Sequence, residues 1–177
     1  VLCAFDDIKA LAPTCQKHNI WLHLDGAFGG GVIFSDKHKH LVDGVNQTNS
    51  FCFNAHKILG NPLSTSILVT KDKNDLFKSF NNQASYLYQT HDDEFNLGQN
   101  SFECGRRNNA LKLWTMWKAI GTSGIANIVN QQFKLADAAR SYVKNNSDYK
   151  LYSFDESLSI CFNYKDLISM NWHSIGK

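Results

Sequence analysis

The sequence predicts an α/β domain with a mostly parallel sheet flanked by helices. Three short apolar segments, Ile20–Leu24, Ser50–Phe53 and Ser64–Thr70, have the length and composition of strands. The first runs directly into an acid, Asp25, and its apolar character suits a parallel strand buried on both faces. Helical patterns before and after these segments favour alternating strands and helices over an all-β fold.

Two helical regions complete the expected architecture. Asp6 is placed to cap a helix that ends near His18, because apolar residues recur behind it at helical spacing. A longer helical region covers residues 108–144, and Gly121 is expected to divide it into two helices. A late strand is expected at Leu158–Phe162.

Composition excludes several functional classes. The chain has 177 residues, 43% of them hydrophobic, which is enough for one domain with a real core. The net charge is +2, and the charged residues are interspersed along the sequence. Neither a nucleic-acid-binding surface nor a membrane-binding surface is therefore indicated. No apolar run reaches transmembrane length. Five scattered cysteines without a CxxC pair favour a reduced, cytoplasmic setting over a metal site.

An acid and a lysine mark the candidate site. Asp25 follows the first strand, and Lys57 follows the second strand directly after His56. The carboxyl ends of parallel strands form the ligand-binding edge of an α/β sheet. Pyridoxal-5′-phosphate (PLP) chemistry needs a lysine that holds the cofactor as a Schiff base and an acid that keeps the pyridine nitrogen protonated. Taken alone, Asp25 is equally consistent with a helix cap or a surface turn.

These motifs resemble the group II PLP-dependent amino-acid decarboxylases, in the glutamate and cysteine sulfinate decarboxylase branch. The resemblance extends from about Phe5 to about Tyr164. It rests on four segments at family spacing: Asp25-x-Ala-x-Gly-Gly, Asn54-x-His-Lys, Cys104-Gly-Arg-Arg and Leu111-Lys-Leu-Trp. It implies a fold type I PLP-dependent transferase-like large domain. The combination is specific for the family and weak for the substrate.

The resemblance also implies residue roles. Lys57 would carry the cofactor, Asp25 would pair with the ring nitrogen, and Ala27 would pack on one ring face. Asn54 and His56 would lie near the cofactor phosphate, although a histidine in an apolar run is more often a satisfied core residue. Ala27 is also consistent with plain core packing.

Further residues belong to an expected substrate pocket. Gly105 and Arg106 match a family segment close to the active-site mouth, where Gly105 would leave room for substrate. An internal ion pair is the favoured reading of Arg106. Phe95 lies in the counterpart of the family's catalytic loop, where several members have a proton-donating tyrosine. Other donors would then have to come from Tyr86, Tyr88 or His91.

One further histidine has two readings. His23 shares a strand face with Asp25, so it could hold that carboxylate. Simple burial is the favoured alternative.

The expected function is PLP-dependent decarboxylation of an acidic amino acid, such as glutamate, aspartate or cysteine sulfinate, to an amine and CO₂. Alternatives are an aromatic substrate, another fold type I activity such as an aminotransferase or a carbon–sulfur lyase, or a non-catalytic chain. The resemblance implies a homodimer. Residues 1–145 are expected to be the C-terminal part of the PLP-binding large domain, and residues 146–177 the beginning of a small C-terminal domain. We expect a fragment of a longer protein, which would hold PLP poorly alone because the family's ring-stacking histidine and phosphate-binding serines lie upstream.

Overall fold

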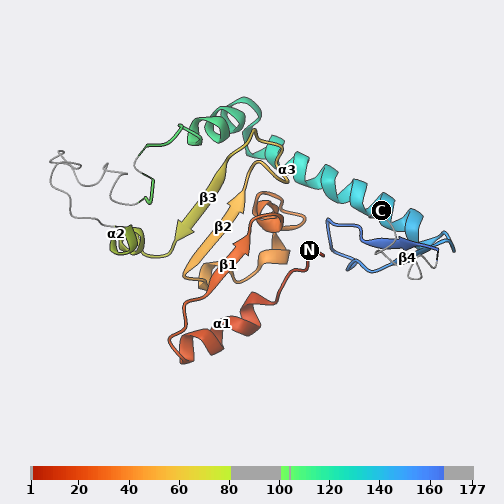
Figure 1. Cartoon of the computed structure of the whole chain (residues 1–177), viewed down its shortest axis with the longest axis horizontal. Helices are drawn as coiled ribbons and strands as arrows, with labels where there is room; N and C mark the ends of the chain where they lie inside the picture. The colour runs from red at the N-terminus through yellow and green to blue at the C-terminus, as the bar shows by residue number, and fades with distance from the viewer. Residues whose placement is uncertain (1, 81–100, 104, 166–177) are drawn as a thin grey trace, which may run out of the picture.

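A computed structural model describes residues 2–80, 101–103 and 105–165 (Figure 1). Phe95 and the rest of the expected catalytic loop, with Tyr86, Tyr88 and His91, lie outside the described residues. The helices are α1 (Ile8–Lys17), α2 (Asn74–Phe80) and α3 (Ala110–Lys144), with 3₁₀ turns η1 (Gly29–Phe34), η2 (Lys39–Val42) and η3 (Val45–Gln47). The strands are β1 (His23–Gly26), β2 (Ser50–Asn54), β3 (Ser66–Thr70), β4 (Tyr149–Leu151) and β5 (Phe162–Tyr164).

The central sheet has three strands in the order β1-β2-β3. β1 and β2 run parallel, with Asp25 opposite Cys52, whereas β3 pairs antiparallel with β2. The predicted α/β class is confirmed, and the sheet is mixed rather than uniformly parallel in the described strands. β4 and β5 form a separate antiparallel pair beyond α3 (Figure 1). Whether this pair opens a second domain at residue 146 stays a prediction.

Local hydrogen bonds explain where β1 and α1 begin. The strand was expected from Ile20, yet the structure starts it at His23. The backbone N–H of Leu22 donates to the side-chain Oδ1 of Asn49 at 2.8 Å. It therefore donates to a side chain and not to a backbone carbonyl of the neighbouring strand. Helix α1 is capped by Asp7, whose carboxylate accepts the N–H of Ala10 at 3.1 Å, and not by Asp6 as expected.

Gly121 divides the long helical region as predicted. It has φ 68° and ψ 176°, which breaks α3 into two helices, and glycine adopts this backbone without a Cβ penalty. The late strand is displaced from the prediction, because the described strand runs over Phe162–Tyr164. The N–H of Cys161 is instead taken by Ser153 Oγ at 2.5 Å.

The core lies between one face of the sheet and the second half of α3. Phe51 and Phe53 of β2 are buried there, and η1 fills the space between sheet and helix. The helix contributes Ile125, Val129 and Phe133, all 4% exposed or less. Because β-strand side chains alternate, Ser50, Cys52 and Asn54 lie on the opposite face of the sheet.

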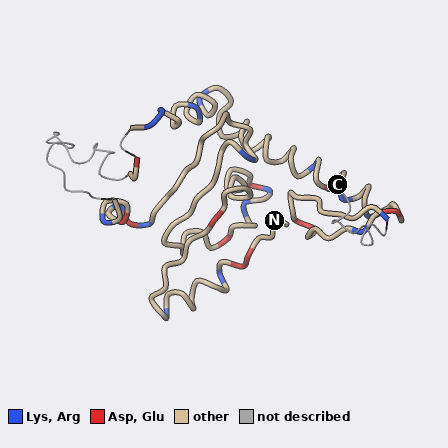
Figure 2. Tube along the Cα trace, viewed as in Figure 1, with Lys and Arg blue, Asp and Glu red and all other residues tan. Residues whose placement is uncertain are grey.

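In the described part of the trace, Lys and Arg are interspersed with Asp and Glu, and β2 and β3 carry no charged residue (Figure 2). No helix within the described ranges has the length and apolar character to cross a membrane. The same ranges contain no group of three or more acidic, histidine or cysteine side chains arranged to hold a metal ion.

Candidate functional site

The ends of β1 and β2 bring the two predicted reactive residues to one edge of the sheet. The parallel register places Gly26, the last residue of β1, opposite Phe53, and β2 ends one residue later at Asn54. The N–H of Asn54 donates to the carbonyl of Ala27 at 3.1 Å, which joins the two turns. The N–H of Lys57 donates to the carbonyl of Asn54 at 3.0 Å and closes the turn that carries the lysine.

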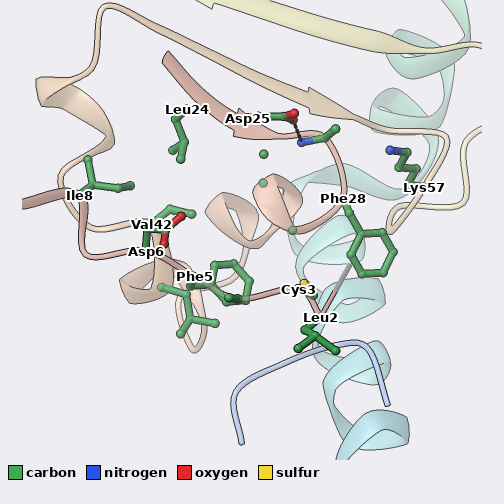
Figure 3. A pocket seen from close by; sticks show the side chains of 16 residues that line it. Leu2, Cys3, Phe5, Asp6, Ile8, Leu24, Asp25, Phe28, Val42 and Lys57 are labelled. Carbon is green, nitrogen blue, oxygen red and sulfur yellow. Dashed lines mark hydrogen bonds between the residues drawn. The ribbon is translucent and has the colours of Figure 1, made fainter. Parts of the chain in front are cut away.

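A pocket of about 390 Å³ opens beside these turns. Its lining includes Asp25, Ala27 and Lys57, and this volume is within the range of small-molecule sites. Figure 3 shows Phe28 and Lys57 at one end of the pocket, Ile8 at the other, and Asp25 along one side. The remaining walls are mainly apolar and come from the N-terminal segment, α1 and η2. Lys57 therefore lies at one end of the pocket, and Asp25 lies along its side.

Asp25 is held ionised by its surroundings. Its Oδ1 accepts the N–H of Ala27 at 2.9 Å and the thiol of Cys52 at 3.5 Å. The Ala27 hydrogen bond is the largest cause of a lowered Asp25 pKa, followed by the Cys52 thiol. The positive charges of His23 and Lys57 act in the same direction, while desolvation opposes them. A carboxylate is thus available where an acidic partner for a ring nitrogen is required.

Lys57 presents an exposed amine at the end of the pocket where Phe28 also lies. Its side chain forms no ion pair with any residue in the described part of the chain. In Figure 3 its Nζ is on the side facing the turn that follows Asp25. The amine is therefore accessible to a carbonyl group entering the pocket.

His56 and Asn54 lie in the same turn as Lys57. The backbone N–H of Thr65 donates to His56 Nδ1 at 2.9 Å, and the Thr65 carbonyl is 3.0 Å from the same nitrogen. Two tautomers fit these contacts: in one, Nδ1 accepts the Thr65 N–H and Nε2 carries the ring proton, and in the other, Nδ1 donates to the Thr65 carbonyl. In the first tautomer, the Nε2–H can donate to a phosphate while Nδ1 is bonded to Thr65. His56 can then be both a structural residue and a phosphate contact. Asn54 is half-buried on the same strand face as Cys52.

Small residues keep the turn close to the sheet. Ala27 is half-buried, and its small side chain lines the pocket beside Asp25. A Cβ added at Gly30 would lie 2.9 Å from Phe51 Cζ and from Phe53 Cβ, so no larger residue fits there without movement. The Ala-x-Gly-Gly segment therefore combines a small pocket wall with close packing onto β2.

Other predicted residues do not join this group. Gly105 and Arg106 are exposed, and neither lines the pocket. The Arg106 side chain is exposed and has no ion-pair partner among the described residues, so its internal ion pair stays a prediction. His23 is also exposed, not buried as favoured, because it lies on the uncovered face of β1. Its Nδ1 is 2.7 Å from Ser50 Oγ rather than bonded to Asp25.

Sequence reasoning missed two supporting features. Cys52 contacts Asp25 across the parallel pair, and period-2 alternation with the strand register would have indicated it. Asn61 and Thr65 are buried and hydrogen-bonded to each other at 2.9 Å at the end of the Lys57 loop. No local sequence signal distinguishes that pair from ordinary loop residues.

The residues present fit pyridoxal phosphate. Lys57 supplies the amine for covalent attachment, and ionised Asp25 supplies the partner for the pyridine nitrogen. Ala27 leaves space for a ring face, and His56 offers a donor on the Lys57 turn. These side chains suit an organic aldehyde cofactor. The described residues contain no group of side chains arranged to bind a metal ion.

Comparison with known proteins identifies the family. The conserved domain of pyridoxal-dependent decarboxylases matches residues 1–165. Cysteine sulfinic acid decarboxylase of Homo sapiens is 40% identical over 166 residues, which are 92% of this chain and 34% of that protein. An acidic amino acid decarboxylase of Mus musculus is 38% identical over 168 residues, covering 93% of this chain and 30% of that protein. The chain thus spans about a third of the length of these relatives.

Solved structures agree in fold. The crystal structure of mouse CSAD has a TM-score of 0.83 and 36% identity, covering 93% of this chain and 34% of that chain. Oryza sativa TDC with PLP and tryptamine has a TM-score of 0.82 at 23% identity, which shows the shared fold alone. These structures confirm the expected fold type I architecture, and the match to the pyridoxal-dependent decarboxylase domain confirms PLP as the cofactor. From its domain match, the chain belongs to the pyridoxal-dependent decarboxylase family.

Proposed function

We propose that the protein containing this chain decarboxylates an acidic amino acid, with Lys57 as the cofactor lysine and Asp25 as the partner of the ring nitrogen. The observation that carries the proposal is the gathering of Asp25, Ala27 and Lys57 in one pocket at the ends of two parallel strands. When bound, pyridoxal phosphate supplies the electron sink that accepts the bonding electrons as CO₂ leaves.

Each residue contributes a defined action. The amine of Lys57 would hold the cofactor covalently. Asp25, with its lowered pKa, would stay ionised and would hold a proton on the pyridine nitrogen, so the ring could accept the electrons left on the substrate. The small side chain of Ala27 leaves space beside the ring plane. His56 Nε2 donates toward the phosphate and helps to fix the orientation of the cofactor.

An acidic substrate is favoured by the relatives. Those at 38–40% identity carry names that specify cysteine sulfinic acid and acidic amino acids. The structure bound to tryptamine is only 23% identical. An aromatic amino acid is therefore the competing substrate class for the test. We also propose a cytoplasmic homodimer, on the family resemblance and the scattered reduced cysteines.

The first experiment asks whether Lys57 holds the cofactor. Protein mixed with pyridoxal phosphate is reduced with borohydride, and the pyridoxyl adduct is located by peptide mass spectrometry. We expect an adduct at Lys57 that is lost in Lys57→Ala and retained in Lys71→Ala, a matched exposed lysine at the end of β3. Labelling spread evenly over surface lysines would contradict the cofactor role of Lys57 in this chain.

A second experiment identifies the reaction. The full-length protein is supplied with cysteine sulfinate, aspartate, glutamate and an aromatic amino acid, and CO₂ and products are measured. Release of CO₂ with the matching amine from an acidic substrate supports the proposal. A keto acid product indicates an aminotransferase, and selective turnover of the aromatic substrate replaces the acidic assignment. No turnover despite a Lys57 adduct supports a non-catalytic cofactor-binding chain.

A further inference from the structure

Cys52 lies beside Asp25 because of the strand register. The parallel pairing of β1 and β2 places these two residues directly opposite each other, on the sheet face that the core does not cover. On its other side Cys52 pairs with Leu68 of β3. The thiol is half-buried and belongs to no disulfide. Its position next to the candidate acid is therefore set by the backbone and not by a flexible loop.

Two donors converge on one oxygen of the Asp25 carboxylate. Oδ1 accepts the N–H of Ala27 at 2.9 Å and the S–H of Cys52 at 3.5 Å, which is within reach of a sulfur hydrogen bond. Within the described residues, no donor reaches Oδ2. The carboxylate is thus held from one side, and its second oxygen remains available.

We infer that Cys52 is a positioning residue: its thiol fixes Asp25 through Oδ1 and so leaves Oδ2 for the ring nitrogen of the cofactor. This inference rests on the proposed function of Asp25. A carboxylate that pairs with a protonated ring must hold both its charge and its rotamer, and a backbone N–H alone permits rotation about that single bond. A second donor from the neighbouring strand removes this freedom.

The competing explanation is that Cys52 merely fills space between Asp25 and Leu68. Replacing the thiol with a methyl group or with a hydroxyl separates the two. If the thiol donates to Asp25, each group changes the ionisation of the other by the same free energy. The Cys52 pKa is raised by burial first and then by the hydrogen bond to Asp25. The nearby negative charge of Asp25 raises the Cys52 pKa as well, so alkylation tests the coupling of the two groups, and the comparison of Cys52→Ala with Cys52→Ser tests donation.

The first test uses cofactor-free protein, so it does not depend on the proposed reaction. Asp25→Asn keeps the side-chain shape and an acceptor oxygen but removes the negative charge. The Cys52 pKa should fall, so its alkylation by iodoacetamide at pH 8 should accelerate severalfold in peptide mass spectrometry. Cys15 and Cys161 are also half-buried and free, so their alkylation rates show whether the substitution increases the accessibility of cysteines throughout the protein. An unchanged ratio of the Cys52 rate to those rates would overturn the inference.

The second test measures cofactor retention in the full-length protein. Cys52→Ala removes the donor, and we expect pyridoxal phosphate to dissociate about 2- to 10-fold more readily, as for loss of one hydrogen bond. Cys52→Ser restores a donor and should bind close to the original affinity. Cys15→Ala is the matched control. Equal retention in Cys52→Ala and the parent protein would overturn the inference, whereas a parent protein that binds no cofactor would overturn the proposed function and leave the alkylation result to decide.

Discussion

The hydroxyl of Thr65 donates to Asn61 Oδ1 at 2.9 Å inside the protein, where the two residues are 2% and 4% exposed. Asn61 Nδ2 in turn donates to the carbonyl of Lys112 at 3.1 Å on α3. The loop that begins at Lys57 is therefore fastened at its far end to a helix that does not line the pocket. The lysine depends on packing well outside the site for its position.

We predict that Thr65→Val lowers the free energy of unfolding by about 1–3 kcal/mol. The substitution keeps the side-chain shape but leaves Asn61 Oδ1 buried without its donor, and an unsatisfied buried acceptor costs this much. Urea denaturation measures the change. Ser79→Ala removes an exposed hydroxyl bond to the Asp75 carbonyl and should change stability far less. Equal effects of the two substitutions would contradict the buried network.

Gly30→Ala should destabilise the fold by about 1–3 kcal/mol, the usual cost of overpacking a tight core contact. The added methyl group would meet Phe51 and Phe53 at 2.9 Å. Gly105→Ala is the control, because a Cβ there has no neighbour within 4 Å in the described part of the chain. Thermal unfolding of both variants checks the difference. A Gly30→Ala variant as stable as Gly105→Ala would show that the η1 turn can move away from β2 without cost.

The sequence was informative where local chemistry decides structure. The placement of Asp25 and Lys57 after two neighbouring strands could be predicted, because apolar strands followed by glycine or polar residues leave a recognisable pattern. The break at Gly121 was predictable for the same reason. The antiparallel direction of β3 could not be predicted, because strand composition does not encode the direction of pairing. The exposure of Arg106 depends on distant segments, and a residue's neighbours in sequence do not report it.

Arg140 is expected to contribute more to the free energy of unfolding than its ion-pair partner, Asp137. It is 5% exposed and donates to the carbonyl of Ser157 and to Asp137 Oδ1, the latter at 2.6 Å. Arg140→Met keeps the apolar stem but removes both bonds, and we expect a loss of about 1.5–3 kcal/mol. Asp137→Asn should cost less than about 1 kcal/mol, since the Asp137 side chain is 64% exposed. Chemical denaturation that ranks the two substitutions in the opposite order would contradict this assignment.

For the acid at the site, we predict that Asp25→Asn reduces decarboxylation by the full-length protein on the order of a hundredfold. The amide keeps the hydrogen bond from Ala27 but cannot hold a proton on the ring nitrogen, so the transition-state charge loses its partner. Asp43→Asn is the control, because Asp43 forms an exposed pair with Lys9. Turnover rates with cofactor in excess separate lost chemistry from lost binding. Full activity in Asp25→Asn would remove Asp25 from the proposed mechanism.

His38 should make the stability of the protein dependent on pH. Its ring stacks on Phe133 with centroids 3.7 Å apart, and its buried Nε2 has no partner among the described residues. Burial is the main cause of a lowered His38 pKa, helped by the positive charges of Lys37 and His40 and opposed by Asp137. The unfolded chain, with a pKa near 6.5, takes up the proton before the folded protein does. Stability is therefore complete above about pH 6.5 and is lost as the pH falls through that value toward the lower folded pKa.

Urea denaturation at pH 7.5 and pH 5.5 tests this dependence. His38→Phe keeps an aromatic ring against Phe133 but cannot titrate, so the difference in unfolding free energy between the two pH values should shrink. His18→Gln, at the exposed end of α1, should leave that difference unchanged and serves as the control. If His38→Phe retains the full pH dependence, the loss of stability in acid comes from other groups. The stacked ring would then stabilise the contact between η2 and α3 through packing alone.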